Sequence, residues 1–91
     1  MKVYFAGPNI FYPDYVDYIT TLKQFSAPFD IEPVFSGEFI EKDPHRIAQF
    51  NLELIKKSKM VIANLNPFRG NEPDSGTVFE CGYAVALGIP V

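Results

Sequence analysis

The chain has 91 residues, of which 47% are hydrophobic, and a net charge of -3 at pH 7. This length indicates one domain at most, covering 1–91, and the apolar content excludes a disordered chain. The sequence contains no cluster of Lys and Arg of the kind that binds nucleic acid, and its apolar runs are too short to span a membrane. The single cysteine, Cys81, and a first segment too short for a secretory leader predict a cytoplasmic protein. No metal site or cofactor is predicted.

The first predicted element is a strand over residues 3–6, which are continuously apolar and rich in β-formers, as in a parallel sheet covered on both faces. Gly7 follows it directly. Either it forms an ordinary turn, or it lets the backbone approach a ligand at the carboxyl end of the strand, where open α/β sheets bind their ligands. Ile10 and Phe11 come next in a loop, where they cover either a planar ligand or the core.

Residues 14–25 carry apolar side chains at helical spacing and predict an amphipathic helix, with its tyrosines in the core or at its rim. A break follows, and then a short strand over residues 31–35. Its proline, Pro33, restricts that strand to the edge of a sheet because proline cannot donate to a strand ladder. Residues 36–42 are expected to form a mobile loop with Phe39 and Ile40 exposed.

A second helix is predicted from Asp43, as the N-cap, to about Lys57, with Pro44 at the first helical position. His45 and Arg46 in its first turn are expected to be solvated. The side chains expected to be buried are Ile47, Phe50, Leu54 and Ile55. Asn51 lies on the same face, where an amide needs either a structural hydrogen-bond partner, the commoner case, or a ligand.

Glu80 is the candidate catalytic residue. A strand over residues 60–65 and a loop of turn formers lead into a helix that is apolar on nearly every side and is therefore expected to be buried. A lone carboxylate there needs a compensating environment. Asp74, Ser75 or Thr77 can cap this helix, which places Glu80 near the positive end of the helix dipole and favours its ionised form. The alternative is a structural role, in which Glu80 either offsets the helix dipole or completes a capping box with Thr77.

The order of elements alternates strand and helix, which is typical of a doubly wound parallel sheet with right-handed crossovers. Gly88 is expected to end the last helix, and residues 89–91 look like the start of another buried strand. A strand of three residues leaves that helix without a following layer. We therefore expect either a missing C-terminal part or completion by a neighbouring subunit.

Three segments together resemble the nucleoside 2-deoxyribosyltransferase family. They are residues 4–8 (Tyr-Phe-Ala-Gly-Pro), 62–70 (Ile-Ala-Asn-Leu-Asn-Pro-Phe-Arg-Gly) and 72–84 (Glu-Pro-Asp-Ser-Gly-Thr-Val-Phe-Glu-Cys-Gly-Tyr-Ala). The last segment is the most specific, because helix packing alone does not require its two carboxylates six residues apart. The resemblance implies a flavodoxin-like α/β fold and transfer of 2-deoxyribose between nucleobases.

The resemblance also implies roles for individual residues. Glu80 would be the nucleophile, Asp74 the acid/base group that protonates the departing base, and Tyr4 would form a hydrogen bond near the nucleophile. Gly7 and the segment of Ile10 and Phe11 would lie over the base. A carboxylate that attacks the anomeric carbon gives a covalent glycosyl-enzyme, and two displacements retain configuration.

Two departures from the family pattern qualify these expectations. Asn51 stands where the family usually has an aspartate, so it can bind a base or sugar but cannot take a proton. The C-terminal portion through which family members contribute to the site of an adjacent subunit is expected to be missing. A homo-oligomer is nevertheless expected.

The expected partners are a small-molecule nucleoside and a free nucleobase, with no nucleic acid or membrane. Two alternatives to base exchange stay open. One is an N-glycosidase that hydrolyses deoxynucleosides or their 5'-monophosphates, with water as the acceptor. The other is a non-catalytic nucleotide-binding module.

Overall fold

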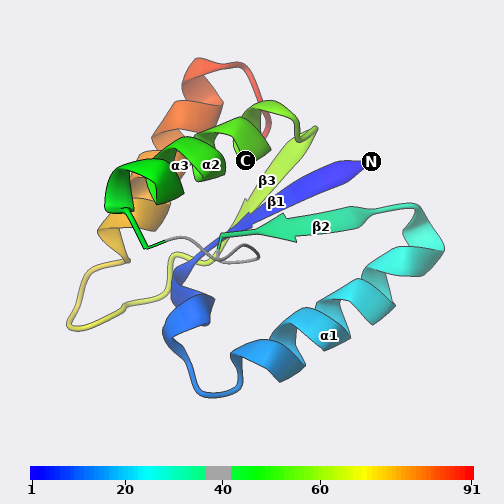
Figure 1. Ribbon diagram of the computed structural model, residues 1–91, viewed down its shortest axis with the longest axis horizontal. Helices are drawn as coiled ribbons and strands as arrows, with labels where there is room; N and C mark the ends of the chain where they lie inside the picture. Colours follow the sequence, from blue (N-terminus) through cyan, green and yellow to red (C-terminus); the bar gives the residue numbers. More distant parts are fainter. Residues whose placement is uncertain (37–41) are drawn as a thin grey trace.

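The computed structural model describes residues 1–36 and 42–91 (Figure 1). Residues 37–41 of the predicted loop, with Phe39 and Ile40, therefore fall outside the described residues. The elements are, in chain order, β1 (Lys2–Ala6), the 3-10 turn η1 (Pro8–Phe11), α1 (Tyr15–Ser26), the 3-10 turn η2 (Ala27–Phe29), β2 (Glu32–Phe35), α2 (Pro44–Lys56), β3 (Met60–Ala63) and α3 (Ser75–Ala86). No helix in the described ranges is both long and apolar enough to cross a bilayer.

The three strands form one parallel sheet in the order β2-β1-β3, which confirms the flavodoxin-like α/β fold. Tyr4 of the central strand pairs with Val34 on one side and Val61 on the other. Strand β2 lies at an edge of this sheet, as Pro33 predicted. The chain crosses from one side of β1 to the other after β2, so the carboxyl ends of β1 and β3 meet at a switch point of the kind that binds ligands in open α/β sheets.

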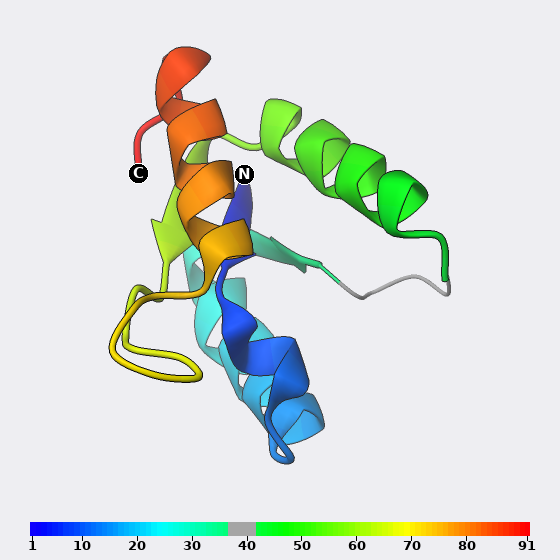
Figure 2. The ribbon, with the colours of Figure 1, turned by 90° about the vertical axis from the view of Figure 1, so that its left-hand side faces the viewer.

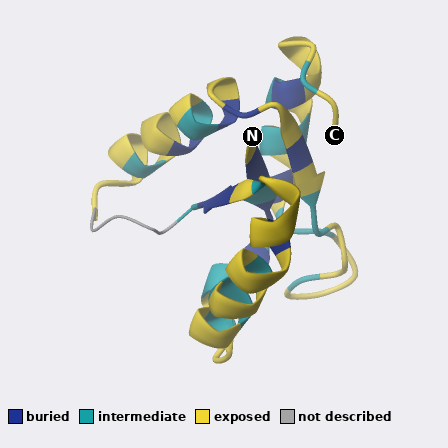
Figure 3. Ribbon diagram, turned by 90° about the vertical axis from the view of Figure 1, so that its right-hand side faces the viewer, coloured by how far each residue is buried: buried dark blue, intermediate teal, exposed yellow. Residues whose placement is uncertain are grey.

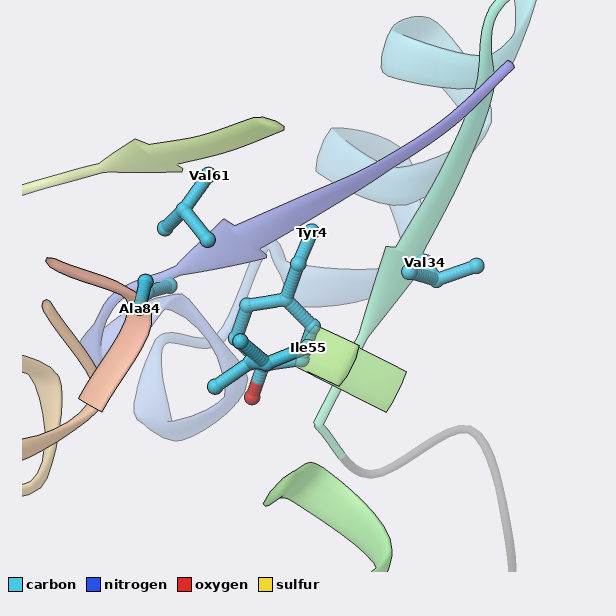
Figure 4. Close-up of a cluster of buried hydrophobic side chains, with 6 residues drawn as sticks. Tyr4, Val34, Ile55, Val61 and Ala84 are labelled. Carbon is cyan, nitrogen blue, oxygen red and sulfur yellow. The ribbon is translucent and has the colours of Figure 1, made fainter. Parts of the chain in front are cut away.

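Helix α1 covers one face of the sheet, and α2 and α3 lie side by side over the other (Figures 1 and 2). The side chains of β1 pack on both faces of the sheet, because successive side chains in a strand point to opposite faces. Phe5 packs against Phe35, and Tyr18 of α1 meets Phe35 edge to face. On the opposite face, Tyr4 packs in a core cluster with Ile55 and Ala84 (Figure 4).

Helix α2 begins as predicted, with Asp43 as the N-cap accepting a hydrogen bond of 3.0 Å from the backbone N–H of His45. Asn51 and Ile55 are buried, whereas Phe50 is 51% exposed. The prediction that Phe50 is buried is wrong. The inner face is centred on Asn51 and Ile55, and Phe50 lies well over a quarter-turn from Ile55 around the helix axis.

Helix α3 is not buried on nearly every side, so that prediction is also wrong. Thr77 and Ala84 are buried, while Val78, Phe79, Val85 and Leu87 are 46–66% exposed. Buried residues gather in the strands and on the inner sides of the helices (Figure 3). In the described residues α3 packs on one side only, against α2, β1 and β3. Apolar composition does not reveal which side of a helix is covered.

The last residues lie beside β3 without forming a strand. The backbone N–H of Val61 donates a 2.8 Å hydrogen bond to the carbonyl oxygen of Pro90. Gly88 has a left-handed φ of 76°, as expected for a residue that ends a helix. Val91 is 55% exposed, so the prediction of a buried strand over residues 89–91 is wrong within this chain.

Candidate active site

Tyr4 and Glu80 form a hydrogen-bonded pair at the centre of the candidate site. The Tyr4 hydroxyl donates to Oε2 of Glu80 over 2.8 Å. Tyr4 is fully buried in β1, and Glu80 lies partly buried in the second turn of α3. The sheet and the helix therefore fix the two side chains from opposite ends of the chain.

The N-terminus of α3 places a second carboxylate near this pair. Asp74 is the N-cap, and its Oδ2 accepts hydrogen bonds from the backbone N–H of Thr77 at 3.0 Å and from the Thr77 hydroxyl at 2.8 Å. Thr77 is thus the third residue of the helix rather than its cap. The capping-box alternative for Glu80 is therefore wrong, since the Glu80 side chain accepts a hydrogen bond from Tyr4 instead.

Burial sets the protonation of Glu80. Desolvation by burial raises the pKa of Glu80 from its ordinary value of 4.5 to about 7, and the negative charge of Asp74 raises it too. Hydrogen bonds from Tyr4 and Asn51 act in the opposite direction. Burial therefore outweighs the hydrogen bonds that stabilise the ionised form, and the contribution expected from the helix dipole stays a prediction.

Asn51 has a structural hydrogen-bond partner, and its role toward a ligand stays a prediction. Its Nδ2 donates to the hydroxyl of Ser36 over 3.1 Å, which is a structural partner. The same amide lies close enough to Glu80 to stabilise its charge. Its Oδ1 is buried and has no hydrogen-bond partner among the described residues. A buried acceptor of this kind is suited to a donor on a ligand.

A cavity of about 340 Å³ opens beside these groups. It is lined by Gly7, Ile10, Phe11, Ser36, Ile47, Asn51, Asp74, Gly76 and Glu80. A second hollow, of about 280 Å³, lies between α2 and α3, shares Asn51 and Glu80 with the first, and extends to Phe79. A third, of about 320 Å³, is lined by residues of α2 and by its C-cap Lys57, and contains none of the candidate residues. The first cavity has the size of a small-molecule site.

The structure brings six of the seven candidate residues onto the wall of this cavity, and Tyr4 reaches it through its bond to Glu80. Ser36, Ile47 and Gly76 were missed. Ser36 follows β2 directly, so the rule that ligands bind beyond the carboxyl ends of parallel strands would have identified it. Gly76 leaves room for the capping carboxylate, because a Cβ there would lie 3.3 Å from Oδ2 of Asp74.

Gly7 is required by close packing rather than by its dihedral angles. A Cβ at this position would lie 2.8 Å from Oδ1 of Asn9 and 3.0 Å from Cβ of Asn64. The backbone N–H of Asn64 donates to the carbonyl oxygen of Ala6 over 2.8 Å, which draws the segments after β1 and β3 together. Gly7 therefore allows the ends of the two strands to meet at the cavity.

Comparison with known proteins identifies the family. The sequence profile of nucleoside 2-deoxyribosyltransferases matches residues 3–91. The chain belongs to this family. A search of curated proteins found no match.

Two solved structures are similar to this deoxyribosyltransferase chain. The first is a 2-desoxiribosyltransferase from Leishmania mexicana, with a TM-score of 0.90 and 36% identity over 99% of this chain and 61% of that one. The second is a conserved protein from Enterococcus faecalis V583, with a TM-score of 0.75 and 29% identity over 100% of this chain and 60% of that one. The chain thus spans about three fifths of the length of each relative.

Tyr4→Phe is expected to raise the pKa of Glu80 further, because the carboxylate loses its hydrogen-bond donor while staying buried. Carboxyl ¹³C chemical shifts recorded over a pH series would measure this pKa without requiring activity. Tyr18→Phe is the matched control, since Tyr18 lies on the α1 face of the sheet. A Glu80 pKa that stays the same or falls in Tyr4→Phe would contradict the role of this bond.

Proposed function

We propose that this protein transfers 2-deoxyribose between nucleobases through a covalent glycosyl-enzyme intermediate on Glu80. The observation that supports the proposal most is the Glu80 carboxylate itself, which is desolvated, bonded to Tyr4 and open to a cavity that a second carboxylate also lines. The relative from Leishmania mexicana is named for deoxyribosyl transfer, which favours the same reaction.

In the first step, an ionised oxygen of Glu80 attacks C1' of the deoxynucleoside. The C1'–N bond breaks, its electron pair passes to the base nitrogen, and Asp74 donates a proton to the departing base. In the second step, a nitrogen of the acceptor base attacks C1', Asp74 takes the proton, and the Glu80 carboxylate leaves. Two inversions give overall retention of configuration.

The pKa of Glu80 suits the first step. With a pKa of about 7, a substantial fraction of Glu80 is ionised at neutral pH and available as a nucleophile. The same raised pKa reflects a carboxylate that is poorly solvated and therefore reactive. Tyr4 orients the carboxylate, while Gly7, Ile10 and Phe11 provide the side of the cavity assigned to the base, and Asn51 offers its free oxygen to the base or sugar.

Hydrolysis is the second candidate reaction, and the exposure of the cavity walls favours it. Phe11 is 56% exposed and Phe79 is 61% exposed, so water can approach a glycosyl-enzyme from both hollows. Water in place of the acceptor base would release free 2-deoxyribose. The same Glu80 and Asp74 would serve both reactions.

An exchange assay separates these outcomes. The protein would be incubated with a deoxynucleoside and a different free base, and the products resolved by chromatography. A new deoxynucleoside is the expected result, whereas free deoxyribose alone would identify a hydrolase. Mass spectrometry after incubation with a 2-deoxy-2-fluoro nucleoside should show an adduct on Glu80. A non-catalytic module would give neither product nor adduct.

A further inference from the structure

Arg69 lies in the loop that connects β3 to α3. Its side chain contacts two aromatic rings, that of Phe68 in the same loop and that of Phe11 at the end of η1. Its guanidinium carbon is 4.7 Å from the centre of the Phe68 ring and 5.2 Å from the centre of the Phe11 ring. The two rings are stacked, with centres 5.6 Å apart and planes inclined by 23°. Both cation-to-ring distances are within the range of a cation–π interaction.

The loop backbone holds Arg69 in this position. The N–H of Phe68 donates to the carbonyl oxygen of Glu72 over 2.8 Å, and an isolated bridge joins Pro67 to Pro73. Arg69 itself has a φ of 55°, a left-handed conformation that is unfavourable for a long side chain. Within residues 1–36 and 42–91, its guanidinium interacts with these two rings. Arg69 thus makes its contacts with the two rings from a strained backbone conformation.

Phe11 contacts both Phe68 and Arg69 and also forms part of the wall of the cavity. It ends η1, lines the cavity with Asp74 and Glu80, and is 56% exposed. A ring this exposed would lose rotamer freedom when a ligand packs against it. Because Phe68 and Arg69 already hold the ring, less of that entropy is lost at the moment of binding.

We propose that Arg69 is a positioning residue that fixes Phe11 as a wall for a flat heteroaromatic ring and thereby sets the affinity for nucleobases. The proposal rests on the proposed function in placing the base at this side of the cavity. Arg69 acts through Phe11, so its contribution should disappear when the Phe11 ring is absent.

The test measures binding of free adenine and free cytosine, since a base without a sugar binds without any reaction at Glu80. Titration calorimetry would compare the unmodified protein with Arg69→Ala, Arg69→Lys and Arg69→Gln. Arg69→Ala is expected to raise Kd about 3- to 10-fold, and Arg69→Lys to recover most of the affinity because it keeps the cation. Arg69→Gln should resemble Arg69→Ala. Arg46→Ala is the matched control, because the Arg46 side chain is 69% exposed and pairs with Asp43.

A double-mutant cycle distinguishes positioning from direct contact. In a Phe11→Leu background, Arg69→Ala should leave Kd unchanged. An equal loss of affinity with and without the Phe11 ring would overturn the proposal, and so would an unchanged Kd in Arg69→Ala with Phe11 present. If Arg69→Ala does not fold, the comparison of Arg69→Lys with Arg69→Gln gives the same decision. Failure of the unmodified protein to bind either base would overturn it as well, while the exchange assay decides the proposed function separately.

Discussion

Glu80→Gln is expected to abolish base exchange, with kcat lowered by about 10³-fold or more, because an amide oxygen cannot form the glycosyl ester. The amide has nearly the shape of the carboxylic acid and can still accept the hydrogen bond from Tyr4. The cavity should therefore keep its affinity for a free base. Exchange rates and base titrations on the same preparation would measure both effects.

The same substitution is expected to stabilise the protein at alkaline pH. The folded-state pKa of Glu80, about 7, lies above its ordinary value of 4.5, so the folded protein binds more protons than the unfolded chain between these values. Stability is therefore lost as the pH rises through this window, by about 3 kcal/mol in total. Glu80→Gln removes that loss, and urea unfolding at pH 5 and pH 8 would show it.

Glu53→Gln is the matched control, because the Glu53 side chain on α2 is 58% exposed. It should leave exchange unchanged and should not reproduce the gain in stability at pH 8. A Glu80→Gln protein that exchanges bases at the normal rate would eliminate the nucleophile assignment. A variant less stable than the unmodified protein at pH 8 would show that Glu80 is not the desolvated carboxyl group described above.

Asp74→Asn is expected to lower kcat by about 10²- to 10³-fold, since the departing base loses its proton donor. Asparagine caps a helix about as well as aspartate, so the free energy of unfolding should change little. The defect should shrink for a deoxyriboside whose leaving group departs as a stable anion, such as 4-nitrophenolate. Rates on a natural deoxynucleoside and on the activated substrate would give this comparison.

Asp43→Asn provides the control, because Asp43 caps α2 through a 3.0 Å hydrogen bond to His45 but does not line the cavity. It should leave both rates unchanged. An Asp74→Asn variant that loses the same factor on both substrates would indicate that Asp74 orients the sugar or holds the helix rather than supplying a proton.

Local signals in the sequence predicted those parts of the fold that depend on neighbouring residues in the chain. Asp43 followed by Pro44 located the start of α2, and Pro33 placed β2 at an edge, because both effects act on the adjacent backbone. The continuous apolar character of residues 3–6 predicted a strand covered on both faces, and α1 covers one face of the sheet while α2 and α3 cover the other. These features need no knowledge of what packs across the sheet.

Tertiary contacts decided the features that the sequence did not predict. The exposure of Phe50 and of the outer side of α3 depends on which neighbours are present, and helical spacing does not contain that information. The protonation of Glu80 likewise depends on how deeply the fold buries it, which outweighed the hydrogen bonds that stabilise its ionised form. The family resemblance, and not the spacing of residues, led us to expect a hydrogen bond of Tyr4 near the nucleophile, and the fold directs that bond to Glu80 itself.

The bond between Tyr4 and Glu80 also constrains how this site can form. It joins positions 76 apart in a chain of 91 residues, and β2, α2 and β3 all lie between them. Contacts of such long range carry a large loop-closure entropy and tend to form late in folding. A partly folded chain would therefore leave this carboxylate hydrated and unreactive, so activity during refolding should recover together with the last native contacts.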